Sequence, residues 1–150
     1  MRIFGLILAL VLAGSVAAAA KAHDGSGAQN RGSRTLHLTK ECSKYNGEAD
    51  SFCTIRTSNL PAITAGSRVV YLQAAGTDSL DSDIVLVVGP GNYALGHVKL
   101  DLTTGLGEVT LSGGAGQFKS FIATARVTPP GGANGADWAW DGKYRFGPQG

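Results

Sequence analysis

Apolar and polar residues alternate with a period of two along much of the chain, which is typical of β-strands with one buried face. The clearest case is Asp137–Phe146, where Trp138, Trp140, Tyr144 and Phe146 share one face and charged residues occupy the other. No segment shows the apolar stripe of an amphipathic helix. The predicted strands are Thr35–Thr39, Ser51–Thr57, Ser67–Ala75, Asp83–Val88, Ala94–Leu102, Glu108–Ser112, Gln117–Val127 and Asp137–Phe146.

The segments between these strands are short and rich in turn residues. Lys40–Asp50 is predicted to be a polar connection, Gly76–Asp81 a polar loop and Thr128–Ala136 a flexible loop. The glycines of Gly113–Gly116 allow a tight chain reversal or a bulge between two strands. Regularly spaced strands of this kind predict an antiparallel barrel or sandwich. We favour an eight-stranded antiparallel β-barrel, because closure removes exposed sheet edges.

The first residues read as an export signal. A basic start at Met1-Arg2 precedes an apolar run from Ile3 to about Val16, and Ala20-Lys21-Ala22 fits an Ala-x-Ala cleavage site. The run is shorter than the roughly 20 apolar residues of a transmembrane helix. We therefore predict a signal peptide over residues 1–22, a flexible leader over 23–34 and one domain over 35–150. The protein is expected to be exported, to the periplasm or the medium, with no stable membrane span after cleavage.

Charge and cysteine content narrow the possible partners. Cleavage removes two of the 13 basic residues and none of the 11 acidic ones, which leaves a net charge near zero. A neutral chain without a basic cluster argues against nucleic acid as a partner. Cys42 and Cys53 are the only cysteines, and in an exported chain they are expected to form a disulfide. Two buried free thiols are the alternative.

Motifs for catalysis or metal binding are weak. Gly113–Ser120 lacks the glycine before Lys119 that a phosphate-binding loop requires. Asp78, Asp81 and Asp83 lack the spacing, glycine and final glutamate of an EF-hand, and a solvated turn explains them better. The three histidines, His97 among them, are far apart and form no metal-ligand pattern. No metal site and no catalytic residue is predicted.

The aromatic face of the last strand is the most informative candidate site. Its side chains are either ordinary barrel core or the wall of an apolar pocket, in which indole N–H and phenol O–H groups would orient a ligand. Both arrangements require inward-facing aromatics, so the pattern leaves both open. The candidate ligand-binding residues are Trp138, Trp140 and Tyr144, with Tyr71 and Phe121 as weaker candidates.

The C-terminal half also resembles a known family. Gly96-His97, the hairpin Gly113-Gly-Ala-Gly-Gln-Phe118 with its flanks, and the aromatic strand Trp138–Phe146 resemble the allene oxide cyclase barrel-like family. That family is related to plant allene oxide cyclases and dirigent proteins. The resemblance covers roughly Asp83–Phe146 and implies a calycin-type, eight-stranded barrel without metal or organic cofactor. Its plant members are trimers that hold a reactive hydrophobic intermediate and control its stereochemistry. The resemblance thus implies a homo-oligomer, a trimer, for this chain, and no catalytic residue is carried over from the family.

Two functions are therefore carried forward. The first is an exported barrel that binds a small hydrophobic ligand and steers its cyclisation or coupling by pocket shape and preorganised polar groups. The second is a non-catalytic secreted or envelope module with a solid barrel core that acts through its surface.

Overall fold

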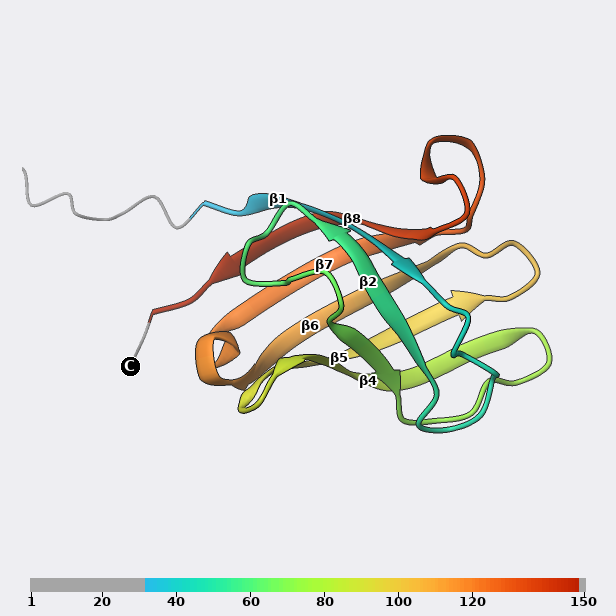
Figure 1. Ribbon diagram of the computed structural model, residues 1–150, viewed down its shortest axis with the longest axis horizontal. Coiled ribbons are helices and arrows are strands. Elements are labelled where there is room, and N and C mark those ends of the chain that lie inside the picture. Colours follow the sequence, from blue (N-terminus) through green and yellow to red (C-terminus); the bar gives the residue numbers. More distant parts are fainter. Residues whose placement is uncertain (1–31, 149–150) are drawn as a thin grey trace, which may run out of the picture.

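The period-two pattern becomes a single closed sheet. In the computed structural model, which describes residues 32–148, eight antiparallel strands follow one another around a closed barrel (Figure 1). The strands are β1 (Arg34–Glu41), β2 (Phe52–Ser58), β3 (Arg68–Tyr71), β4 (Ser79–Gly89), β5 (Asn92–Asp101), β6 (Gly107–Ala115), β7 (Phe121–Thr128) and β8 (Trp138–Phe146). Two short 3₁₀ helices, η1 (Gly116–Phe118) and η2 (Gly132–Asn134), follow β6 and β7. The predicted eight-stranded antiparallel barrel is confirmed.

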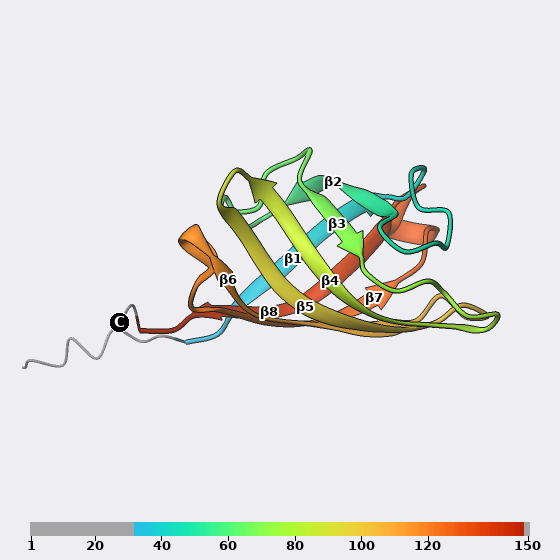
Figure 2. The same cartoon turned by 90° about the horizontal axis from the view of Figure 1, so that it is seen from below.

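Closure is made by pairing of the first and last strands. β8 runs antiparallel to β1 with Leu38 opposite Trp140 and Lys40 opposite Trp138. Figure 2 shows the strands crossing the barrel obliquely, so that β3, β4 and β5 pass over β1 and β8. This tilt is what closing eight strands requires. The inward residues of all eight strands meet in one core.

Several predicted boundaries were wrong. β4 begins at Ser79, inside the predicted loop Gly76–Asp81, and β3 ends at Tyr71 rather than Ala75. Lys40 and Glu41 belong to β1 and not to the connection that follows it. The predicted strand Gln117–Val127 starts only at Phe121, because Gly116 adopts a φ of 61° and the chain turns through η1 first.

The two ends of the barrel differ. At one end Phe118 of η1 is fully buried, and Leu60 and Ile63 of the β2–β3 connection are buried as well. These two segments meet where the Gln117 side chain donates a hydrogen bond to the Ala62 carbonyl. Phe118 packs edge-on against Phe121. This end is therefore filled by side chains.

Inward glycines allow the sheet to curve tightly. A Cβ built on Gly142 of β8 would lie 2.0 Å from the Thr124 carbonyl oxygen, and one on Gly96 of β5 would lie 2.3 Å from the Thr110 carbonyl oxygen. No side chain fits at such distances. Glycine at these points lets neighbouring strands approach closely, as at the corners of a barrel.

The predicted signal peptide and most of the predicted leader lie outside the described residues. Arg34, the last residue of the predicted leader, already belongs to β1. Within residues 32–148, no helix has the length and apolar character to span a membrane.

Candidate functional site

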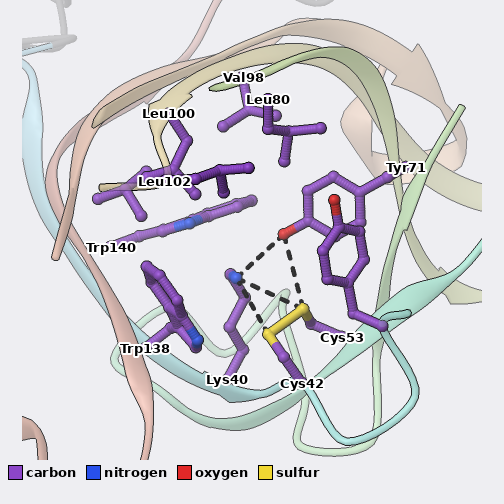
Figure 3. A pocket seen from close by; sticks show the side chains of 12 residues that line it. Lys40, Cys42, Cys53, Tyr71, Leu80, Val98, Leu100, Leu102, Trp138 and Trp140 are labelled. Atoms are coloured by element: carbon purple, nitrogen blue, oxygen red, sulfur yellow. Dashed lines mark hydrogen bonds between the residues drawn. A yellow bond between two sulfur atoms is a disulfide. The ribbon is translucent and has the colours of Figure 1, made fainter. Parts of the chain in front are cut away.

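A cavity occupies the end of the barrel opposite the one that Phe118 fills. Figure 3 shows the side chains that line it. Its volume is about 50 Å³, well above the roughly 10–15 Å³ that one water molecule needs. Strands β1, β5 and β7 end here, and β4 and β8 begin here. The lining side chains are Lys40, Cys42, Tyr45, Cys53, Tyr71, Leu80, Val98, Leu100, Leu102, Val127, Trp138 and Trp140.

Lys40 is the only cation in this lining. It continues the inward face of β1 begun by Leu36 and Leu38, and only 3% of its surface is exposed. The same face of β8 supplies Trp140 and Trp138, which are opposite Leu38 and Lys40. The same alternation that places Leu36 and Leu38 in the core therefore places Lys40 there as well.

The amino group of Lys40 has few polar partners. Its Nζ lies 3.0 Å from Tyr71 Oη, 3.5 Å from Cys42 Sγ and 3.6 Å from Cys53 Sγ (Figure 3). Among residues 32–148, no carboxylate forms an ion pair with it. A phenol and two disulfide sulfurs are poor substitutes for water around an ammonium ion.

Aromatic rings surround the same amino group. Nζ is 5.5 Å from the ring centroid of Trp138 and 5.7 Å from those of Tyr71 and Trp140. Cation–π attraction supplies on the order of 1–2 kcal/mol, whereas burying an ion costs several kcal/mol even after relaxation. The rings therefore offset only part of the burial penalty.

Burial consequently favours the neutral amine. It lowers the pKa of Lys40 from 10.5 to about 7, because removal from water penalises the charged form. Burial also raises the pKa of Tyr71 and that of Tyr45. Near neutral pH the site thus combines an amine that is partly unprotonated with a phenol that keeps its proton.

Two further polar groups of the lining lack partners. The Trp140 indole Nε1 and the Tyr45 hydroxyl are buried, and neither has a hydrogen-bond partner within residues 32–148. A buried donor without an acceptor costs about 1–3 kcal/mol. Both are donors that a polar atom of a bound molecule, or a water, would satisfy.

The lining has a buried part, which we call the floor, and a partly exposed part, which we call the rim. Lys40, Tyr71 and Trp140 are buried, together with Leu80, Val98 and Val127. Trp138, Leu100, Leu102, Cys42 and Tyr45 are partly exposed. A ligand would reach the amine by passing between these rim side chains, several of which belong to the connections between strands.

The structure brings three of the five predicted ligand-binding residues together. Trp138, Trp140 and Tyr71 line the cavity. Tyr144 and Phe121 do not: Phe121 packs against Phe118, Tyr144 and Phe146, toward the plugged end. Both alternatives for the aromatic face of β8 therefore hold: its first residues form the cavity wall, and its last residues are packed core.

Sequence reasoning missed Lys40. The spacing Leu36, Leu38, Lys40 and Cys42 holds the signal, because extending the alternation by one step puts the lysine on the core face. A polar residue next to a turn was instead read as the end of the strand. The prediction failed because Tyr71 and Cys53, which contact the Lys40 amino group, come from other strands.

The predicted disulfide is confirmed. Cys42 and Cys53 are bonded, and both sulfurs lie beside Lys40 in the cavity wall. The bond ties the end of β1 to β2 across the β1–β2 connection, which also carries Tyr45. It therefore fixes one side of the rim.

His97 and two of the loop aspartates considered as metal ligands lie on the outside of the barrel. His97 of β5 contacts Asp81 at 2.7 Å and Asp83 at 2.9 Å on the neighbouring strand, with all three side chains substantially exposed. Within residues 32–148, no group of three His, Cys, Asp or Glu side chains is arranged to hold a metal ion.

Comparison with protein-family models, with curated proteins and with solved structures finds no match to this chain. The site must be interpreted from its own geometry.

Proposed function

We propose that the barrel binds one small, mainly apolar molecule in the cavity around Lys40. One observation carries this proposal: a cavity with an apolar wall contains a buried amine that no carboxylate of the described chain neutralises. Sites for small molecules combine mostly apolar walls with a few polar groups that set orientation. Lys40, Tyr71 and the Trp140 indole N–H are the groups that would do so here.

The cavity also limits the size of the ligand. About 50 Å³ admits only part of a larger molecule, so a longer apolar tail would extend past the partly exposed rim. Confinement of this kind selects one ligand conformer, which is how a barrel would steer a cyclisation or coupling. Such steering, and membership of the allene oxide cyclase barrel-like family that the sequence resembles, are part of the proposal.

Export belongs to the same proposal. The Cys42–Cys53 disulfide is of the kind that persists in oxidising compartments. Together with the predicted signal peptide it supports a function in the periplasm or the medium, where small hydrophobic molecules would reach the barrel from solution.

Trp138→Ala tests the binding site. Trp138 is partly exposed and forms the rim beside Lys40, so truncation should weaken binding of 1-hexanol at least about tenfold by removing apolar contact area. Both tryptophans of the chain line the cavity, so tryptophan emission in the unmodified protein reports on this site alone. Affinities in the variants are compared by ligand-induced shifts of the unfolding temperature.

Tyr93→Ala is the matched control. Tyr93 is an aromatic on β5 that is 36% exposed, and its loss should leave the affinity for 1-hexanol unchanged. Absence of saturable binding to the unmodified protein, or equal weakening by both substitutions, would contradict the proposed site.

A non-catalytic module that acts through its surface is a second candidate function, because a row of apolar side chains lies on the outer wall of the barrel. Phe52, Val70, Val85 and Leu95 are aligned across β2, β3, β4 and β5, and Leu95 is 45% exposed. These four side chains carry no charge, and the Arg68 guanidinium lies over the Phe52 ring at one end of the row, 5.3 Å from the ring centroid. A second copy of this chain offers an equally long, uncharged row, so self-association is the interaction that it favours.

Leu95→Lys tests this candidate. A buried lysine in the contact would be unpaired, so the variant should be monomeric at concentrations where the unmodified protein is oligomeric, as measured by light scattering after size exclusion. Ile122→Lys is the control, since Ile122 is 37% exposed on β7, outside the row. A monomeric unmodified protein at all concentrations would eliminate this candidate.

A further inference from the structure

Lys40 has a chemical capacity that apolar binding does not use. Its amine is buried among three aromatic rings and a disulfide, and the nearest polar atom is Tyr71 Oη at 3.0 Å. A lysine that serves only to fill space would be replaced by an apolar residue without loss. The unprotonated fraction of a lysine at the floor of a cavity is a nucleophile.

We propose that Lys40 captures apolar aldehydes or ketones as an imine, so that carbonyl compounds are the ligand class of this cavity. The inference rests on the proposed function, because the carbonyl compound must first enter the cavity. The geometry that supports it is the juxtaposition of the amine, a phenol within hydrogen-bond distance and an apolar wall.

The reaction balances without any further reagent. The Nζ lone pair attacks the carbonyl carbon, a C–N bond forms, and the carbonyl oxygen takes a proton from the Tyr71 hydroxyl. The nitrogen then returns a proton to the Tyr71 oxygen, which gives a neutral carbinolamine. The C–O bond breaks, the oxygen leaves as water with the Tyr71 proton, and the remaining N–H proton restores Tyr71. Aldehyde and amine thus become imine and water.

Burial sets the protonation states of Lys40 and Tyr71 that the reaction requires. Burial lowers the pKa of Lys40 to about 7, so about half of the amine is unprotonated at pH 7, against on the order of one in 10³ for an ordinary lysine. The other titratable side chains of the lining are Tyr45 and Tyr71, and burial raises the pKa of each. They remain protonated over the range in which Lys40 titrates.

An apolar carboxylic acid is the competing ligand class. A carboxylate would pair with protonated Lys40 and would supply the missing counter-ion. It would, however, bring a second charge into a lining with no other ionised group, and burial of an ion pair often fails to repay its desolvation. A neutral carbonyl group enters without that penalty.

Hexanal, 1-hexanol and hexanoic acid, which share one chain length, separate the possibilities. Each is incubated with the full protein at pH 7 in the presence of sodium cyanoborohydride, and adducts are located by intact mass and peptide mapping. We expect one hexyl group on Lys40 from hexanal, with modification there at least about tenfold faster than at exposed Lys143. The rate at Lys40 should rise with pH up to about 7 and then level off.

Variants make the outcome decisive. Lys40→Met and Lys40→Arg should lose the adduct, with cooperative urea unfolding showing that each variant is folded. Tyr71→Phe should form the adduct at least about tenfold more slowly, since proton transfer to the oxygen is lost. Adducts spread over exposed lysines with none at Lys40, or tight binding of hexanoic acid without any hexanal adduct, would overturn the imine. Failure of 1-hexanol to bind would instead remove the proposed function itself.

Discussion

Replacing Lys40 with methionine is expected to stabilise the protein by about 3 kcal/mol at pH 7. The lowered pKa of Lys40, about 7 against 10.5, means that protonation favours the unfolded chain by about 1.4 kcal/mol for each pH unit between these values. The full penalty, on the order of 5 kcal/mol, applies below pH 7. The substitution also removes the hydrogen bond between Lys40 and Tyr71, which lowers the expected gain in unfolding free energy by about 1–2 kcal/mol.

The sign of the pH dependence follows from the two pKa values. Between pH 7 and 10.5 the unfolded state binds more protons at Lys40 than the folded state, so the unmodified protein becomes more stable as pH rises. The advantage of Lys40→Met should therefore shrink and vanish toward pH 10. Below pH 7 both states are protonated and the advantage is constant.

Urea unfolding with the disulfide intact measures this difference at pH 6, 7, 8.5 and 10. Lys143→Met is the control, because Lys143 lies on β8 but is exposed. Its effect should be within about 0.5 kcal/mol at every pH. A Lys40→Met variant that is no more stable than the unmodified protein at pH 7, or whose advantage is the same at pH 10, would contradict a buried, unpaired amine.

Trp140→Ala is expected to have the largest effect in the opposite direction. Trp140 is fully buried and connects the β1 and β7 neighbours of β8, being opposite Leu38 and Val127. Truncation of such a side chain costs about 3–5 kcal/mol through lost contacts and the space left behind. It also removes the Trp140 ring from the cavity wall, so binding of 1-hexanol should weaken through lost apolar contact area.

Indole distinguishes a filled core position from a general loss of structure. Added indole should bind the enlarged cavity and recover part of the lost stability, as expected for a ligand that binds only the folded state. Chemical denaturation with and without indole measures both effects, and Tyr93→Ala provides an exposed aromatic control. A loss below about 1 kcal/mol, or no recovery with indole, would contradict the packing of Trp140 described above.

The alternation of apolar and polar residues predicted the barrel because it is kept along most of the strands, most regularly in β7. Val98 is buried and its neighbour Lys99 exposed, as the pattern of β5 requires. The disulfide followed from an even cysteine count in a chain predicted to be exported. These features depend on local sequence or on composition, and both can be read without tertiary information.

The predicted boundaries failed where a polar residue occupies the core or a glycine redirects the chain. Ser82 of β4 is fully buried. Its hydroxyl accepts a hydrogen bond from the backbone N–H of Gln73 and donates one to the backbone carbonyl of Asp83. A buried serine satisfied in this way resembles a loop residue in sequence. Gly116 likewise ends β6 because its positive φ starts η1.

The candidate site was only half predictable. The aromatics Trp138 and Trp140 were identified from their shared face, but Lys40 was not, since its burial depends on Tyr71 from β3 and on the disulfide. Hydrophobicity patterns rank lysine as a surface residue. Lys40 is therefore the most informative residue of the cavity: it is polar, unlike the leucines before it, but it occupies the next inward-facing position of β1.

Native mass spectrometry of the protein isolated from the cells that make it is the decisive test of a ligand-binding cavity around Lys40. The account predicts a bound small molecule that denaturation releases, that is absent from Trp138→Ala and that is replaced by added 1-hexanol. A protein that carries no small molecule, and whose mass is unchanged after incubation with 1-hexanol and with hexanal, would contradict a ligand-binding cavity around Lys40.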